Sequence, residues 1–258
     1  MSSSAARALR ILAAVGDSGR SMGVTEIARI LGVAPGTAFR GLDALQRAHL
    51  LVRDPSAPRY VAGATALALR QSLLAQFRIR DVALPYLRQL ASATGETCSL
   101  HVRIGWYAAR IATAPGTAEV TSGAILSGTE LLSSDFAGRA ILAFLDRNHA
   151  AQHRAWTSAR GLPSPAALER DLAAIRVCGF AQRSGPEGGV AFPICVQDQA
   201  FASIAVEGSG LAAAGPKPSR RPDGAEIATA IEAVVRANPA LCYQPFQHID
   251  ADEIVLPS

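Results

Sequence analysis

The chain has 258 residues, of which 49% are hydrophobic and 18% charged. This length and composition predict a globular protein of one large or two ordinary domains, and they exclude a disordered chain. No apolar run approaches the roughly 18 to 20 residues that a membrane helix needs, and the sequence shows no secretory leader, so we expect a cytoplasmic protein.

Positive charge is concentrated near the N-terminus. Up to Arg70 there are nine arginines and four acidic residues, a net charge of +5, whereas the remainder has a net charge of −1. Neutralisation of phosphates supplies most of the nonspecific affinity of a protein for DNA. The charge distribution therefore predicts that the N-terminal segment docks on a polyanion.

The first predicted helix covers residues 4–15, and the serines at positions 2–4 are candidate caps. A loop over residues 16–23 follows it. Helical spacing predicts one apolar face, made of Ala8, Leu9, Ile11, Leu12 and Val15.

Two short helices joined by a tight turn are predicted next. Thr25 is the expected N-cap of the first helix, Gly32 its left-handed C-cap, and Pro35 the first residue of the second helix. The apolar face of the first helix is predicted to be Ile27, Ala28, Ile30 and Leu31. The buried stripe of the second is predicted to be Ala38, Gly41, Leu42 and Leu45.

The opposite face of the second helix carries Gly36, Arg40 and Arg47, with Thr37 and Phe39 on its flanks. This face is small, cationic and able to donate hydrogen bonds, as a helix in the major groove of DNA must be. The alternative for these residues alone is an ordinary helical hairpin with solvated arginines.

A short hairpin is predicted directly after these helices. Two apolar stretches, 50–52 and 60–62, flank a proline-rich turn, and Arg53 and Arg59 lie at its base. A basic hairpin in this place is a wing that contacts the phosphate backbone, although any short loop has a similar pattern.

The rest of the chain predicts helices and strands in irregular alternation, which favours an α+β fold with an antiparallel sheet. We expect helices over residues 64–75, 81–94, 137–145 and 168–177, and strands over 97–102, 108–112, 190–196 and 200–206. The apolar positions of the second of these helices face either the core or a partner subunit: Val82, Leu84, Leu87 and Leu90.

Several segments together resemble the IclR family of bacterial transcriptional regulators. They are RALRIL, TEIARILGV, PGTAFRGLDALQ, RYVAG, LPYLRQLASATGETCSL, DFAGRAILAFL, LAAIRVCGFA and IAVEGSG, in the order and nearly the spacing of the family up to about Gly208. The resemblance implies four parts: a winged helix-turn-helix domain (1–63), a linker helix (64–77), a GAF-like α+β domain for effector binding and oligomerisation (78–242), and a C-terminal tail (243–258).

The helix pattern, the wing and the resemblance together predict a set of DNA-binding residues: Thr25, Pro35, Gly36, Thr37, Phe39, Arg40, Arg47, Arg53 and Arg59. One position departs from the family, because Gly36 stands where a serine is usual. The loss of that hydroxyl leaves Thr37 and Arg40 as the main candidates for readout.

The resemblance places the effector pocket at the start of one helix, in a following loop and on the last strand. The implied lining residues are Leu131, Leu132, Ser133, Ser134, Asp135, Ala137, Gly138, Val190, Phe192, Ala205 and Glu207. Amides at a helix start suit a carboxylate, but Asp135 can occupy them itself, and Ala205 and Glu207 replace small hydroxyl residues. We hypothesise that the ligand is not a small dianionic acid, and is neutral, amine-bearing or absent. The alternative is that Asp135 only caps its helix and that Glu207 points to solvent.

Other candidate sites are weak, and we expect no cofactor or metal. His149 and His153 lie four residues apart without a third ligand, so we interpret them as solvated. Ser209 lacks the spacing of a hydrolase nucleophile, and residues 211–224 and 246–258 are interpreted as a loop and a tail. The cysteines lack CxxC spacing and are interpreted as buried thiols: Cys98, Cys178, Cys195 and Cys242.

These observations predict a ligand-responsive DNA-binding regulator, more consistent with a repressor than an activator, and not an enzyme. One helix-turn-helix makes few contacts, so we expect a homodimer or homotetramer that binds paired operator half-sites. The alternatives are a second domain that only oligomerises, or an enzyme-like second domain that the first targets to DNA.

Overall fold

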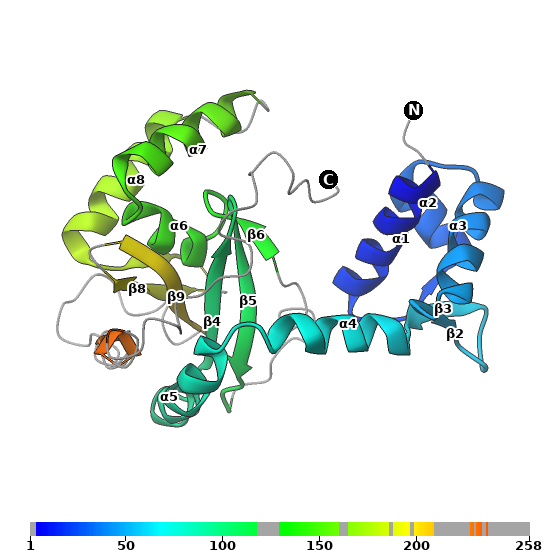
Figure 1. The fold of residues 1–258 in the computed structure, drawn as a ribbon, viewed down its shortest axis with the longest axis horizontal. Coiled ribbons are helices and arrows are strands. Elements are labelled where there is room, and N and C mark those ends of the chain that lie inside the picture. The colour runs from blue at the N-terminus through cyan, green and yellow to red at the C-terminus, as the bar shows by residue number, and fades with distance from the viewer. Residues whose placement is uncertain are drawn as a thin grey trace. The chain divides into compact units, whose positions relative to one another are not determined.

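The computed structural model describes residues 4–117, 129–159, 165–185, 188–196 and 199–208, together with 228–229, 231–233 and 236. Ser209, Cys242, the predicted loop 211–224 and the predicted tail lie outside these residues. The chain divides into two compact units between Gln76 and Phe77 (Figure 1). None of the described helices is long and apolar enough to cross a membrane.

In the part of the chain that the structure describes, the first unit contains four helices and a small antiparallel sheet. In chain order its elements are α1 (Ser4–Ser18), β1 (Met22–Gly23), α2 (Val24–Leu31), α3 (Pro35–Arg47), β2 (Leu51–Arg53), β3 (Arg59–Ala62) and α4 (Ala64–Leu74). The strand order is β1-β3-β2, so the predicted wing hairpin forms with a third strand that the sequence did not indicate. β1 has two residues and pairs only Met22 with Tyr60 and Gly23 with Arg59, too short a segment to show strand periodicity.

The start of α2 corrects one prediction. Gly23, in extended conformation, is the N-cap, and no side chain caps this helix. Thr25 therefore lies inside the first turn and is exposed. The end is as predicted, because Gly32 has φ 63°, a left-handed conformation that glycine adopts without steric cost.

The core of the first unit confirms most of the predicted apolar faces. Its buried residues are Ile11, Val15, Met22, Ile27, Ala28, Ala38, Leu42, Leu45, Leu51 and Tyr60. Two predicted core residues are exposed instead, Leu9 at 60% and Ile30 at 53%. At about 100° per residue, each side chain lies just outside the stripe that its helix buries. The predicted apolar faces of these two helices were therefore wider than the buried ones.

The second unit is a six-stranded antiparallel sheet with helices packed on it (Figure 1). From residue 79 to residue 207 its described elements are α5 (Ile79–Thr94), β4 (Thr97–Ile104), β5 (Tyr107–Ala114), β6 (Thr129–Leu131), α6 (Phe136–Ala143), α7 (Arg147–Ala159), α8 (Pro165–Cys178), β7 (Ala181–Arg183), β8 (Gly189–Val196) and β9 (Gln199–Glu207). The strand order is β6-β5-β4-β9-β8-β7. The predicted α+β class with an antiparallel sheet is confirmed.

Side-chain alternation assigns the two faces of this sheet. Ser203 of β9 donates from Oγ to the carbonyl oxygen of Ala137 in α6 at 2.9 Å, so it faces α6. Ser99 of β4 pairs with Ala205, two residues after Ser203, and shares that face. The neighbouring thiol of Cys98 points the other way, toward Thr94 at the end of α5. We call the surface around Ser203 and Ser99 the α6 face.

Candidate functional site

The outward side of α3 is the candidate DNA-reading surface. Ala38, Leu42 and Leu45 are buried, so the opposite side of the helix faces solvent and exposes Gly36, Phe39, Arg40 and Arg47, with Thr37 partly buried. Pro35 occupies the first turn, as predicted. The structure therefore brings together most of the predicted DNA-binding residues, on one helix.

Two arginines on this surface differ in their partners. Arg40 donates from Nη2 to Oγ1 of Thr37 at 3.3 Å, a contact one turn back that aligns its guanidinium along the helix. Arg47 forms an ion pair with Asp43, which offsets its charge. Arg40 is thus the stronger candidate for contact with a base.

Arg59 has an internal role that the sequence did not indicate. Its Nη2 donates to the backbone oxygen of Ser21 at 2.7 Å and to Oε2 of Glu26 at 3.1 Å. Glu26 also pairs with Arg20, whose hydrogen bond lowers the pKa of Glu26. These contacts tie β3 to the start of α2 and argue against Arg59 as a phosphate anchor, because its Nε and Nη2 donors already bind Ser21 and Glu26.

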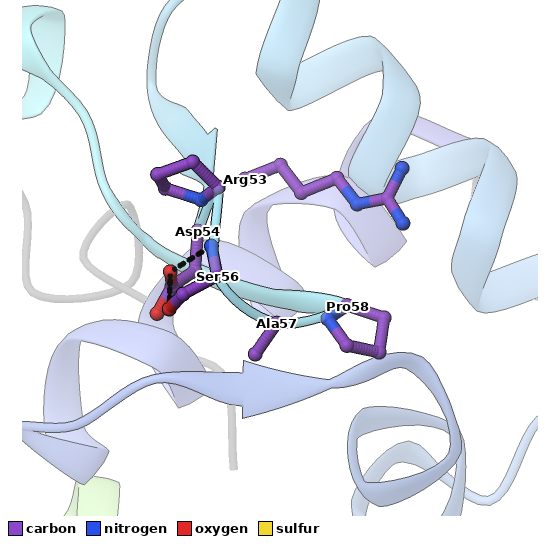
Figure 2. Close-up of a pocket in the computed structure, with 6 residues that line it drawn as sticks. Arg53, Asp54, Ser56, Ala57 and Pro58 are labelled. Carbon is purple, nitrogen blue, oxygen red and sulfur yellow. Dashed lines mark hydrogen bonds between the residues drawn. The ribbon is translucent and has the colours of Figure 1, made fainter.

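The tip of the wing, residues 53–58, is open to solvent (Figure 2). An open hollow of about 390 Å³ is lined by Arg53, Asp54, Pro55, Ser56, Ala57 and Pro58. Asp54 accepts hydrogen bonds from the backbone nitrogen and the hydroxyl of Ser56, at 2.8 and 2.6 Å, which lower its pKa. Arg53 extends away from that carboxylate and forms no ion pair with any residue that the structure describes, so its guanidinium is available to a phosphate.

In the second unit, Asp135 organises the start of α6. It is the N-cap and accepts from the backbone nitrogen of Ala137 at 3.4 Å, as the sequence suggested. Its other carboxylate oxygen pairs with Arg183 of β7 at 3.4 Å, and that guanidinium lies over the ring of Phe136, 4.6 Å from its centroid. The helix start is therefore occupied by an internal carboxylate that has its own cation.

A second ion pair lies on the α6 face. Arg110 of β5 reaches Glu207 at the end of β9 at 2.8 Å, and only 12% and 13% of these two side chains are exposed. The expectation that Glu207 points to solvent is therefore wrong. Beside this pair, Oγ of Ser99 lies 2.9 Å from Nε2 of His101. Burial, reinforced by the charge of Arg110, lowers the pKa of His101 to about 3, so this imidazole is neutral near pH 7.

Strand pleating separates two of the predicted lining residues from the others. Val190 pairs with Val206, and Phe192 with Ile204, whereas Ala205 pairs with Ala191. Successive side chains alternate between faces, so Val190 and Phe192 lie on the face away from α6. The residues of β8 on the α6 face include Gly189, Ala191 and Pro193, and the prediction for this strand was out of phase by one residue.

Other predicted lining residues belong to the packed core. Leu132, Ala137 and Ala205 are fully buried and join the apolar cluster between α6 and the sheet. A Cβ added at Gly138 would lie 2.7 Å from the Cα of Leu132, so this glycine permits close approach of the chain. Leu131 is partly buried and Ser134 exposed, while the backbone oxygen of Ser133 accepts a bond from Arg139.

The histidines and cysteines correct two further interpretations. His153 is buried rather than solvated, its ring meets Trp106 edge-on, and burial lowers its pKa to about 4. His149 instead bonds Asp146 through Nδ1 at 2.6 Å.

The cysteines were predicted to be buried thiols. Cys178 is exposed, although Cys98 is buried. No group of three candidate ligands for a metal occurs among the described residues.

Four polar residues of the α6 face were missed from the sequence: Ser99, His101, Arg110 and Arg183. Alternation along β4 was a usable signal for Ser99 and His101, because they are polar residues two apart in an apolar strand. Nothing in the sequence indicated that Arg110 would pair with Glu207, 97 residues away.

Comparison with protein families gives two matches on this chain. Residues 4–55 match the IclR helix-turn-helix domain, and residues 71–191 match the C-terminal domain of the bacterial transcriptional regulator IclR.

Individual relatives agree with these matches. The HTH-type transcriptional regulator BhcR of Paracoccus denitrificans is 29% identical over 96% of this chain and 88% of its own length. The transcriptional repressor IclR of Escherichia coli is 27% identical over 78% of each chain. A shorter match, 39% identical, covers 38% of this chain and 37% of the glycerol operon regulatory protein of Streptomyces griseus.

The fold also matches solved structures. A crystal structure of an IclR homolog from Microbacterium hydrocarbonoxydans, complexed with 4-hydroxybenzoate, aligns with a TM-score of 0.68 at 22% identity, over 92% of this chain and all of that one. An IclR family regulator from Brucella abortus aligns with a TM-score of 0.66 at 20% identity, over 91% and 93% of the two chains.

Proposed function

This chain belongs to the IclR family of bacterial transcriptional regulators, and we propose that it is a repressor that binds paired operator half-sites as an oligomer. Its helix-turn-helix binds DNA and its C-terminal domain binds an effector, as in the family. Repression is supported by the relative from Escherichia coli, which is named a transcriptional repressor. A regulator of this kind works where the chromosome is, in the cytoplasm.

The observation that carries the proposal is the exposed, cationic side of α3 beside the wing. Arg40 projects from α3, and Arg53 projects from the wing without an internal partner among the described residues. All of the chain's excess positive charge lies in this unit. Arg40 is placed to read a base and Arg53 to hold the backbone.

Binding to operator and random DNA tests this assignment. Arg40→Ala should weaken binding to a selected operator by about 1 to 3 kcal/mol, with a much smaller loss on random DNA, because a guanine contact is sequence-specific. Arg53→Ala is the matched control and should weaken binding to both DNAs equally. Equal losses for Arg40→Ala on the two DNAs would assign this residue to phosphate instead.

Oligomerisation is supported by α4, which has no buried residue in its unit. Leu67, Leu69 and Leu73 are 54%, 60% and 36% exposed, and a helix that leaves several leucines in water is usually covered by another chain. We propose that α4 packs against a second copy. Pairing two helix-turn-helix units would supply the contacts that one unit lacks.

The charges on the α6 face support a limited class of effector. Asp135 and Glu207 already pair with Arg183 and Arg110, so a small dianion would have to compete with two internal carboxylates for the same cations. The ligand is therefore neutral or amine-bearing rather than a small dicarboxylic or keto acid. The Microbacterium homolog complexed with 4-hydroxybenzoate supports small-molecule binding by this domain in general.

Calorimetric titration tests the ligand class. Small keto acids and dicarboxylates should bind the protein weakly or not at all, compared with neutral lactones and amines. Glu207→Ser, which restores a small hydroxyl residue and releases Arg110, should gain affinity for keto acids. Tight binding of a keto acid to the unmodified protein would overturn this class. If no ligand of any of these classes binds, a second domain that only oligomerises would be favoured.

A further inference from the structure

One aromatic side chain on the reading surface has no role inside the protein. Phe39 is 53% exposed, and it is the most exposed of the phenylalanine, tyrosine and tryptophan side chains in the described part of the chain. The buried stripe of α3 consists of Ala38, Leu42 and Leu45, so Phe39 stabilises the fold little. An exposed phenylalanine on a cationic face indicates contact with a partner.

The surroundings of Phe39 specify the shape of that partner. Gly36 precedes it by one turn, and a Cβ added there would meet nothing within 4 Å, so the backbone is open to close approach. Arg40 follows it and is held by Thr37. The surface thus combines the open backbone at Gly36, the apolar ring of Phe39 and the guanidinium of Arg40. All three lie in the first two turns of α3.

The major groove of DNA offers the matching chemistry. The 5-methyl group of thymine is the apolar feature that a base pair presents there, and phenylalanine is one of the side chains that contact it. Guanine, in turn, offers O6 and N7 to an arginine. Because Phe39 and Arg40 are adjacent on the helix, they would address neighbouring positions of one half-site.

We propose that Phe39 is a specificity-determining residue that contacts the 5-methyl group of a thymine next to the base pair read by Arg40. This inference rests on the proposed DNA-binding function and adds the chemical feature that is read. The charge of the first unit, +5 through Arg70, favours DNA over an apolar protein partner for this surface.

Removal of a single methyl group tests the inference directly. Double-stranded sites are first selected by the full-length protein from random DNA. Each thymine of the selected site is then replaced in turn by deoxyuridine, which lacks only the 5-methyl group. At one position in each half-site, the replacement should weaken binding about fourfold, the value for one buried methyl-sized group.

The same DNAs are then measured with two variants. Phe39→Ala should bind the thymine site more weakly and show no response to deoxyuridine at that position, whereas Phe39→Leu should keep part of the response. Ile30→Ala is the matched control, because Ile30 is also 53% exposed but lies on α2. This control should respond to deoxyuridine as the unmodified protein does.

Three outcomes would overturn the inference. If no thymine of the site is sensitive to its methyl group, or if Phe39→Ala remains as sensitive as the unmodified protein, Phe39 does not read thymine. If Phe39→Ala lowers the mass of the oligomer in sedimentation, a second copy covers the ring instead. Failure to select any DNA would overturn the proposed function itself, so the two failures are distinguishable.

Discussion

At the scale of single residues, internal partners decide whether an arginine stabilises the fold or is available to bind DNA. Arg53 and Arg59 flank the same turn and are indistinguishable in sequence. In the structure Arg59 is bound to Ser21 and Glu26, whereas Arg53 has no ion-pair partner within the described ranges. One arginine therefore fixes the wing, and the other is available for DNA.

This difference predicts opposite effects for the two variants. Arg59→Ala should lower the melting temperature of the protein and leave the salt dependence of DNA binding unchanged, because it loses internal hydrogen bonds. Arg53→Ala should leave the melting temperature unchanged and lower the slope of log K against log salt by about one, since one phosphate contact is lost. Thermal melts and binding titrations over a range of salt check both. A reduced slope of log K against log salt for Arg59→Ala would instead show that Arg59 contacts a DNA phosphate.

Acid sensitivity of the second unit is also a residue-scale property. Burial lowers the pKa of His153 to about 4 from an ordinary value of 6.5. Between these values the unfolded chain binds more protons, so the free energy of unfolding falls as the pH falls from 6.5 to 4. The slope due to one such histidine is at most about 1.4 kcal/mol per pH unit.

His153→Phe should flatten this dependence and preserve the edge contact with Trp106. Stability at neutral pH should be equal or higher, because Nε2 of His153 is buried without a hydrogen-bond partner among the residues described. Urea unfolding at several pH values between 4 and 7 measures the slope. An unchanged slope would show that His153 does not stay neutral in the folded state.

At the scale of elements, α6 shows how a helix position depends on a single small residue. The helix packs so closely on the segment before it that a Cβ at Gly138 would lie 2.7 Å from the Cα and 2.8 Å from the carbonyl oxygen of Leu132. Both contacts are with backbone atoms, so neither can be relieved by rotation of a side chain. The start of α6, and Asp135 with it, is thus fixed by close packing.

Gly138→Ala should therefore destabilise the second unit by about 1 to 3 kcal/mol, the usual range for overpacking. Tryptophan fluorescence during urea unfolding is a suitable probe, because both tryptophans of the chain, Trp106 and Trp156, lie in this unit. Gly36→Ala is the control, since it meets open space and should leave stability unchanged or raise it by up to about 1 kcal/mol. Equal stability of Gly138→Ala and the unmodified protein would contradict the packing argument.

At the scale of the whole molecule, the proposed regulation couples effector binding in one unit to DNA binding by the other. An effector can shift DNA binding only if it has different affinities for two arrangements of the assembly. α4 directly precedes the boundary between the units and exposes three of its four leucines, Leu67, Leu69 and Leu73. In the proposed oligomer, a contact between copies through α4 would therefore link the DNA-binding units.

Leu69→Glu tests this contact. A charge within an apolar interface costs more than it does in water, so the variant should dissociate at concentrations at which the unmodified protein remains an oligomer, as measured by sedimentation velocity. Val177→Glu is the matched control, because Val177 of α8 is 88% exposed but is not part of an apolar helix surface. If Leu69→Glu keeps the same mass as the control, α4 is not the interface.

The sequence by itself determined the type and order of most of the longer elements, whereas it did not predict the short strands β1, β6 and β7. Gly32 ended α2, Pro35 began α3, and Gly95, with φ 73°, ended α5. Glycine adopts the left-handed conformation of a helix end without steric cost, and proline fixes the φ angle of a first helical turn. Helical spacing likewise identified Ala38, Leu42 and Leu45 as buried. These features depend on neighbours within a few residues, which a sequence shows directly.

The tertiary structure alone decided which side chains meet. The pairing of Arg110 with Glu207 and the binding of Arg59 to Ser21 join residues 97 and 38 positions apart. The separation of Val190 from Ala205 depended on strand register, in which a shift of one residue reverses the face. Local patterns do not encode register or long-range partners, so the charge balance of the α6 face emerged only once the strands were paired.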